Sequence, residues 1–204
     1  MKKSYLFVST LLCCWLFMAA VSAVPPFSAA AESGNVALPK PDSTGGKPLM
    51  EALSLRKTTR SFSDKAISEQ DLSNLLWSAW GVNRPDGRRT VPTSMNKQNA
   101  ALYVVMQNGV WLYDGEKHQL SLALAGDMRS KYGSAPLTLL YAAEDGYYAS
   151  GMHVGSMYQN AGLYCASAGL GNVVKRSDVD ALDGTLKLPA KYKVLIVQSI
   201  GWPE

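Results

Sequence analysis

The chain has 204 residues and a formal net charge of +4, and 47% of its residues are hydrophobic. Most of this length suits one domain with a sizeable core. Of the three cysteines, only Cys165 lies beyond the first 23 residues, which excludes a fold held by internal disulfides. The net charge is close to zero, so the sequence lacks the basic character of a nucleic-acid-binding protein.

The first 23 residues have the parts of a secretory signal peptide. Two lysines precede an apolar run over residues 5–21, and small residues follow up to Ala23. This pattern predicts export to the periplasm by the Sec route, with cleavage after Ala23 and a second candidate cleavage site after Ala31. Cleavage at Ala23 would lower the formal charge to +2. An uncleaved membrane anchor remains the alternative, because a run of about 17 residues is at the lower limit for spanning a bilayer.

Residues 24–47 are rich in Pro, Ser, Ala and Gly and predict a flexible lead-in. A short helix is expected over residues 48–55, with Pro48 in its first turn. A longer helix is expected from the capping residue Ser68 to Gly81. Its apolar residues fall on one helical face, which comprises Leu72, Leu75, Leu76, Ala79 and Trp80.

A polar loop over residues 81–99 follows, and long ordered loops of this kind tend to carry function. Residues 101–114 predict a β-hairpin with Asn108-Gly109 at its turn. Buried strands are expected over residues 135–144 and 193–203.

A buried helix is expected over residues 153–171, in which Gly155, Ala161 and Gly162 would let another helix approach closely. Its apolar face comprises Val154, Met157, Tyr158, Ala161, Cys165 and Ala168. Helices and strands are mixed without a strict βαβ alternation, so the predicted fold class is α+β.

The sequence contains few side chains that are arranged for catalysis or metal binding. The two histidines, His118 and His153, do not stand at metal-ligand spacing, so the sequence predicts no metal site. It contains no serine nucleophile elbow, P-loop or dinucleotide fingerprint. We interpret His153 as structural and Cys165 as a buried core residue. An enzyme with this sequence would therefore use an organic cofactor.

Four segments, taken in order, resemble the nitroreductase family of FMN-dependent oxidoreductases. They are "LRKTTRSFSDKAIS", "EQDLSNLLWSAWGVNRPDGRRTVPTSMNKQ", "NAGLYCASAGLGNVVKRS" and the closing strand with "IGWP". The first matches the pattern Arg-x-Ser/Thr-x-Arg/Lys-x-Phe, and the second resembles a short branch of the family. The resemblance covers residues 48–203. It implies a nitroreductase-like FMN-binding domain over residues 48–204, with a central, mostly antiparallel sheet flanked by helices in an intertwined homodimer.

The resemblance implies FMN as the cofactor and assigns the first segment to it. Arg56 and Arg60 would bind the phosphate or the ring carbonyls, since a guanidinium donates in two directions at once. Thr58 would add a hydrogen bond, and Lys57 would face water. A solvated basic turn is the alternative interpretation of this segment.

The resemblance also implies that Thr93, Ser94 and Asn96 reach a flavin that is bound mainly by the partner subunit. Loop capping is the alternative for Ser94 and Asn96. Three loop arginines would contact phosphate or substrate, or would simply face solvent: Arg84, Arg88 and Arg89.

In "VVKRS", the backbone would approach flavin N5 and O4, with Val174, Lys175 and Arg176 as candidates. A backbone N–H at N5 would stabilise charge that develops there. Many family members carry a further Lys/Arg pair beyond the closing strand, where this sequence has Glu204 as its last residue. We therefore expect either that Arg56, Arg60 or the loop arginines bind the phosphate, or that FMN binds weakly.

The function that the resemblance implies is ping-pong transfer of electrons through flavin N5 in a homodimer with two FMN sites. The donor would be NAD(P)H or another reductant, the acceptor a small nitroaromatic or quinone-like molecule, and no side chain need act as acid or base. Export is in tension with a nicotinamide donor, which is scarce outside the cytoplasm. Two alternatives stay open: an exported flavin-binding module without turnover, and an azoline-type dehydrogenase that acts on a peptide.

Overall fold

The computed structural model describes residues 34–132, 135–176 and 184–204, so the predicted signal peptide, residues 1–23, lies outside the described residues. The helices within these ranges are α1 (Leu49–Leu55), α2 (Glu69–Trp80), α3 (Ser150–Ala168) and the short 3-10 helices η2 (Ser94–Asn96) and η3 (Arg129–Lys131). None of these helices has the length and apolar character needed to span a membrane.

The strands of the described chain form one antiparallel sheet, which confirms the predicted α+β class. Their order is β1-β4-β3-β2-β5-β7-β6, so β1 and β6 form the two edges. The strands are β1 (Asn35–Ala37), β2 (Ala100–Met106), β3 (Gly109–Asp114), β4 (Gln119–Ala125), β5 (Leu137–Glu144), β6 (Gly171–Lys175) and β7 (Tyr192–Gly201).

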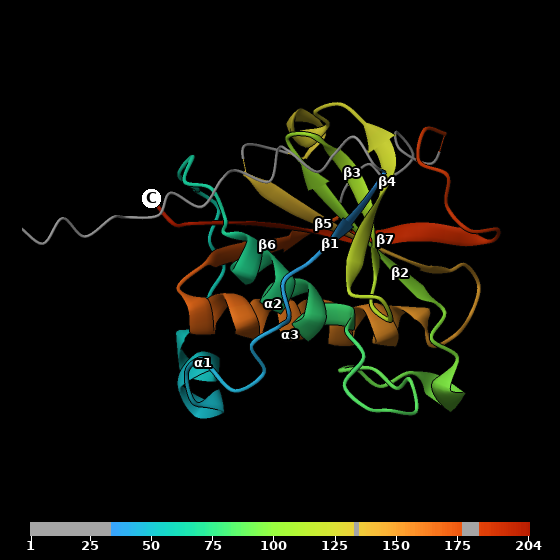
Figure 1. Cartoon of the computed structure of the whole chain (residues 1–204), viewed down its shortest axis with the longest axis horizontal. Coiled ribbons are helices and arrows are strands. Elements are labelled where there is room, and N and C mark those ends of the chain that lie inside the picture. The colour runs from blue at the N-terminus through green and yellow to red at the C-terminus, as the bar shows by residue number, and fades with distance from the viewer. Residues whose placement is uncertain (1–33, 133–134, 177–183) are drawn as a thin grey trace, which may run out of the picture.

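Hydrophobic cores lie on both faces of this sheet. The helices α2 and α3 cover one face, and α1 lies beside the C-terminal end of α3 (Figure 1). The other face packs against residues of irregular segments, including Tyr132 and Leu186. Because both faces are covered, central strands such as β2 and β5 are almost continuously buried, which explains why their sequences read as apolar runs rather than as alternating patterns.

The helix α2 forms as its sequence predicts. The Ser68 hydroxyl accepts a hydrogen bond from the Asp71 backbone N–H at 3.0 Å, which satisfies one of the unpaired donors of the first turn. At the other end, the Gly81 N–H donates to the Trp77 carbonyl. All five predicted apolar residues of this helix are buried.

The helix α3 begins three residues before its predicted start and ends at Ala168. Its predicted apolar face is confirmed, since four of its residues are buried and Tyr158 and Ala168 pack against the same core. Gly162, however, faces the sheet, where a Cβ would lie 3.6 Å from the Asn172 side-chain oxygen and 3.7 Å from the Gln198 amide nitrogen. The prediction that Gly162 lets another helix approach is therefore wrong, because this glycine adjoins a buried pair of side-chain amides.

The hairpin of β2 and β3 is present, but its turn differs by one residue from the prediction. Met106 pairs with Gly109, which makes Gln107 and Asn108 the turn residues. Gly109 has a φ of +150°, and a Cβ there would lie 2.7 Å from the Leu124 carbonyl oxygen. Glycine is thus required at this position by the close approach of β4, a strand that the sequence patterns did not reveal.

Residues 34–47, which we call the N-terminal strap, are fixed to the domain. β1 pairs with β4, the Asp42 N–H donates to the Asn74 side chain at 2.8 Å, and the Lys47 N–H donates to the Ser167 hydroxyl at 2.7 Å. The expectation of a flexible lead-in is therefore wrong for the strap, and its remaining part, residues 24–33, lies outside the described residues.

Candidate functional site

Two separate regions contain the predicted site residues. The first is residues 56–62, which we call the edge segment because they lie along the outer edge of β6. Thr58 forms a parallel bridge with Asn172, and the Thr59 N–H donates to the Asn172 carbonyl at 2.9 Å. The structure thus brings together the "LRKTTRSF" and "NVVK" motifs, which lie more than a hundred residues apart in the sequence.

A glycine and a buried polar network fix this contact. A Cβ on Gly171 would lie 2.7 Å from the Thr59 Cβ, so glycine allows the edge segment to lie against β6. Behind the strand, the Gln198 amide donates to the Asn172 side-chain oxygen at 2.9 Å, and Gln198 accepts a 2.5 Å hydrogen bond from the Tyr141 hydroxyl. These buried partners hold the β6 backbone in one position.

A hollow of about 350 Å³ opens where the edge segment meets β6. It combines cationic and apolar side chains, and its lining comprises Arg60, Phe62, Ala135, Val173, Val174, Lys175 and Ser199. Its volume is within the range of small-molecule sites. Four lining residues were not among the predicted site residues: Phe62, Ala135, Val173 and Ser199. Phe62 is nevertheless the last residue of the first motif, Arg-x-Thr-x-Arg-x-Phe.

The cations of this region are available to an anion. Arg56 and Arg60 are exposed, and neither takes part in an ion pair among the residues that the structure describes. Lys175 donates to the Tyr132 carbonyl, and partial burial lowers the pKa of its ammonium group. Thr58 is exposed beside the arginines, and Arg176 is exposed directly after β6.

The geometry of β6 distinguishes two of the three backbone candidates, because Arg176 lies beyond this strand. Peptide groups of an edge strand alternate between its neighbour and its open side. The Asn172 carbonyl points to the open side, where it accepts from Thr59, so the N–H of Val174 points the same way. Both residues pair with β7, but by the same alternation the N–H of Lys175 points towards Val197 of that strand. Of Val174 and Lys175, therefore, only Val174 presents its N–H beside the edge segment.

The second region is residues 93–98, which we call the 93–98 turn. The Ser94 hydroxyl is 2.7 Å from the Tyr148 hydroxyl, and the Ser94 N–H donates to His153 Nε2 at 2.8 Å. The Thr93 hydroxyl accepts from the Gln98 N–H at 3.2 Å, and Asn96 is exposed and accepts from the Gln98 side chain at 3.1 Å. Thr93 and Asn96 therefore form hydrogen bonds within the turn, as the loop-capping alternative expects for Asn96.

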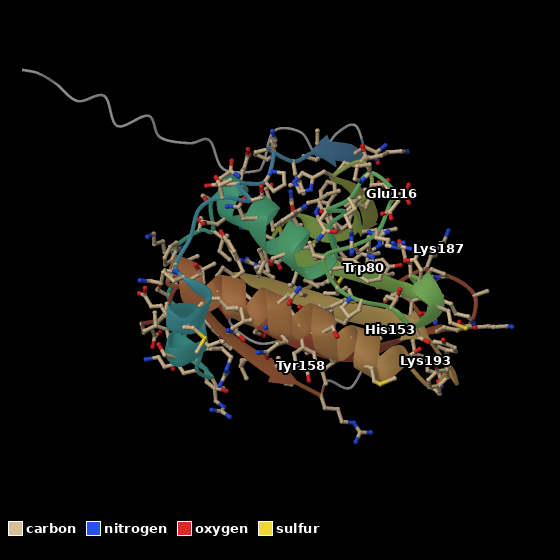
Figure 2. The ribbon with its side chains drawn as sticks, turned by 90° about the horizontal axis from the view of Figure 1, so that it is seen from below. Trp80, Glu116, His153, Tyr158, Lys187 and Lys193 are labelled. Atoms are coloured by element: carbon tan, nitrogen blue, oxygen red, sulfur yellow. The ribbon has the colours of Figure 1, made fainter. Side chains whose placement is uncertain are left out.

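The two regions lie at opposite ends of α3. The 93–98 turn contacts the first turn of this helix through His153, whereas the edge segment lies against β6, which follows its last residue (Figures 1 and 2). A helix of 19 residues is about 28 Å long. Within one chain, therefore, the two regions are too far apart to contact the same flavin ring.

The loop arginines have different environments. Arg89 donates to the Gln98 side chain at 2.7 Å and to the Trp80 carbonyl at 2.8 Å, and its guanidinium lies 4.4 Å from the centre of the Trp80 ring. Neither surface solvation nor ligand contact fits this half-buried residue, which fixes the loop instead. Arg88 forms an exposed ion pair with Asp86, and Arg84 donates to the Arg89 carbonyl at 2.9 Å.

The described part of the chain contains no cluster of metal ligands, and its cysteine and its other histidine are buried or hydrogen-bonded. No group of three potential metal ligands occurs within it. Cys165 is buried, and burial raises the pKa of its thiol. His118 lies 2.7 Å from the Ser73 hydroxyl and 2.8 Å from the Tyr113 hydroxyl, beneath the strap.

Comparison with known proteins identifies relatives over most of the chain. The model of the nitroreductase family matches residues 53–202. A protein of Methanocaldococcus jannaschii that bears the name nitroreductase is 28% identical over 151 residues, which cover 61% of this chain and 76% of that protein.

Solved structures agree with this result. The crystal structure of a nitroreductase from Ralstonia eutropha JMP134 has a TM-score of 0.79 and 36% identity, and the match covers 84% of this chain and 90% of that chain. A nitroreductase with bound FMN from Bacteroides fragilis has a TM-score of 0.56 and 16% identity over 78% of this chain and 89% of that chain, a likeness of fold.

Proposed function

Because the chain belongs to the nitroreductase family, we propose that it is an FMN-dependent oxidoreductase whose flavin binds in the hollow where the edge segment meets β6. The observation that carries this proposal is the contact between these two segments. It places two arginines that form no ion pair with any described residue, an outward backbone N–H and a hollow of about 350 Å³ in one region. A phosphate requires the cations, and a flat aromatic ring suits the apolar walls, so the residues present fit FMN.

Each part of the site would have its own role. Arg56 and Arg60 would bind the phosphate or the ring carbonyls, and Thr58 would donate a hydroxyl hydrogen bond. The Val174 N–H would donate to N5, with the backbone of Lys175 and Arg176 nearby. When bound, the flavin supplies two-electron chemistry at N5, and the chain orients it and stabilises charge there.

We propose that the active form is a homodimer, because each site would lack the 93–98 turn without its partner. Large exposed apolar side chains lie near both ends of α3: Leu49, Met50, Leu53 and Leu55 of α1 near one end, and Met95, Tyr148 and Met152 at the other. Exposed apolar patches mark interaction surfaces. A two-fold axis across α3 would place the 93–98 turn of one copy beside the edge segment of the other.

The proposed reaction is a ping-pong transfer from a donor, NAD(P)H or another reductant, to a small nitroaromatic or quinone-like acceptor at the same flavin face. Export to the periplasm, with cleavage after Ala23, belongs to the same proposal and rests on the sequence pattern of residues 1–23.

The test is a visible spectrum of the purified protein, before and after FMN is added. Flavin bands are expected in the wild type. The Arg56→Ala/Arg60→Ala variant should bind FMN about a hundredfold more weakly, because each lost charge-assisted bond is worth about tenfold or more. Lys57→Ala, a matched loss of an exposed cation in the same segment, should leave affinity within about threefold.

Anaerobic mixing with NADH then distinguishes turnover from mere binding. Bleaching of the flavin bands, followed by their return when a nitroaromatic or quinone is added, would support the oxidoreductase. Stable flavin bands with NADH and with other reductants would favour a flavin-binding module. Failure to bind FMN after reconstitution would overturn the proposed cofactor, and equal affinity in the double variant would overturn the role of the edge segment.

A further inference from the structure

A buried histidine binds the backbone of the 93–98 turn. His153 lies on the first turn of α3 (Figure 2). Its side chain is 3% exposed. Its Nε2 atom is 2.8 Å from the backbone nitrogen of Ser94, a residue 59 positions away in the sequence. A backbone N–H can only donate, so Nε2 must accept and carries no proton.

The protonation state of this histidine is fixed from its other side. The Glu144 carboxylate accepts from the Asn99 amide nitrogen at 3.0 Å, which directs the Asn99 side-chain oxygen towards His153 Nδ1 at 2.9 Å. Nδ1 therefore donates, and the imidazole is the neutral Nδ1–H tautomer. A chain of three hydrogen bonds thus connects a carboxylate to the Ser94 backbone N–H.

The turn that His153 binds has an unfavourable backbone. Met95, Asn96 and Gln98 have φ values of 52°, 52° and 47°, in the left-handed region that non-glycine residues seldom adopt. Ser94 is the residue before them, and its backbone and hydroxyl are bound by His153 and Tyr148. Surrounding contacts must hold such a conformation, and these are the contacts from the α3 side.

Other charged groups lie on segments around the imidazole. The ammonium of Lys97 lies 4.3 Å from the centre of the Tyr147 ring, which lies 5.9 Å from the His153 ring, and Lys193 pairs with Asp145 at 2.9 Å. Among the described residues, the titratable or charged groups that these contacts place in the region of His153 are Lys97, Glu144, Asp145, Tyr147, Tyr148 and Lys193. Of these groups, Glu144 is the one that hydrogen bonds connect to the imidazole within the described chain, through the neutral amide of Asn99.

We propose that His153 is a positioning residue that holds the 93–98 turn in its flavin-contacting conformation only while its imidazole is neutral, so that acid releases the turn. This inference rests on the proposed function, in which the turn completes the partner's flavin site. A protonated imidazole would carry N–H groups on both nitrogens, and Nε2–H would face the Ser94 N–H.

The direction of the pH effect follows from linkage. Burial lowers the pKa of His153 while the turn is bound, whereas a released and hydrated imidazole has its ordinary pKa near 6.5. The released form therefore binds more protons as the pH falls below about 6.5, and acid favours it by up to tenfold per pH unit. Above that pH both forms are neutral, and the bond is intact.

The experiment combines two readouts on the full mature chain at pH 7.5 and pH 5.5. The first is hydrogen exchange of the backbone amides of residues 93–98 without flavin, corrected for the intrinsic pH dependence of exchange. The second is the dissociation constant of FMN. Three variants are compared with the wild type: His153→Phe, which fills the ring volume without an acceptor; His153→Gln, which keeps an acceptor that does not titrate; and His118→Gln, the matched control at the second histidine.

In the wild type and in His118→Gln, acid should weaken both protection of the turn and FMN affinity by about tenfold. In His153→Gln the acid effect should disappear, apart from any titration of the phosphate itself, which all variants share. In His153→Phe, protection should be lost and FMN should bind about tenfold more weakly at both pH values.

Unchanged exchange and affinity in His153→Phe would overturn the positioning role, and an acid effect on hydrogen exchange of the turn that persists in His153→Gln would overturn the switch. Hydrogen exchange of the 93–98 turn could depend on the residue at position 153 although the protein binds no FMN at either pH. That result would overturn the proposed function and the flavin part of this inference, while the role of the hydrogen bond between the Ser94 N–H and His153 would stand. The two failures are therefore distinguishable.

Discussion

The edge segment and the 93–98 turn are built in opposite ways. The edge segment presents exposed arginines on a strand edge, and its side chains have no acidic partners among the described residues. The turn has few charges, and a buried histidine and a tyrosine fix its strained backbone. The attraction between charges acts over several ångströms and changes little with small displacements, whereas a contact made by the backbone depends on its exact position. We infer that the first region would provide affinity and the second would provide geometry.

The largest effect is expected when the buried hydrogen-bond network behind β6 is broken. Gln198→Leu would leave the Tyr141 hydroxyl and the Asn172 side chain without their buried partner. We expect a loss of about 3 kcal/mol in the free energy of unfolding, because two buried polar groups become unsatisfied. Urea denaturation measures this loss. A change below about 0.5 kcal/mol would show that the network does not stabilise β6.

A smaller loss is expected where the edge segment contacts β6. In Gly171→Ala, the new Cβ would meet the Thr59 side chain at 2.7 Å and push the segment away. We expect a loss of about 2 kcal/mol, together with weaker FMN binding. Gly151→Ala is the matched control, because a Cβ at this helical position meets no atom within 4 Å. If both variants behave alike in denaturation and FMN titration, close approach at Gly171 is unimportant.

Beside the 93–98 turn, the two hydrogen bonds that Arg89 donates, to Gln98 and to the Trp80 carbonyl, can be weakened without removing its charge; we call them the Arg89 clamp. Lysine cannot reproduce the two directed hydrogen bonds to Gln98 and Trp80. Arg89→Lys should cost about 1.5 kcal/mol and raise hydrogen exchange in the 93–98 turn. Arg88→Lys, at an exposed ion pair, should change neither quantity measurably. Equal effects in the two variants would contradict the clamp.

The smallest effect concerns acid stability, to which both histidines contribute. Burial lowers the pKa of His118 and of His153. The unfolded chain therefore binds more protons than the folded chain as the pH falls below about 6.5, and each histidine reduces stability by at most about 1.4 kcal/mol per pH unit. Denaturation midpoints measured from pH 7.5 to pH 5.5 should fall less in His118→Gln than in the wild type. A steeper fall in the variant would reverse the expected sign.

Local signals in the sequence predict much of the fold. Ser68 with Asp71, the spacing of Leu72, Leu75 and Leu76, and the apolar run of β5 each determine their own element. The strands β1, β4 and β6 were missed, and so was the one-residue shift of the hairpin turn, because they depend on partners distant in the sequence. Gly109 is required by the Leu124 carbonyl of β4, which no local pattern reveals.

The candidate site was predictable to different degrees in its two regions. The resemblance of the motif of Arg56, Thr58 and Arg60 to the nitroreductase pattern implies an anion site, whereas its residue types alone equally fit a solvated basic turn, and the structure adds the contact with β6. His153 was interpreted as merely structural, because its partners Ser94 and Asn99 lie 59 and 54 residues away. Hydrogen bonds between distant residues leave no periodic signal in a single sequence.

The N-terminal strap has a consequence for how the chain avoids aggregation. Its three-residue strand β1 covers the outer edge of β4, and its hydrogen bonds to α2 and α3 keep it there. An uncovered strand edge is a template for pairing with other chains. Proteolytic removal of residues up to Lys47 would expose this edge, so we expect the shortened protein to keep its helices yet to associate through β4 into insoluble assemblies.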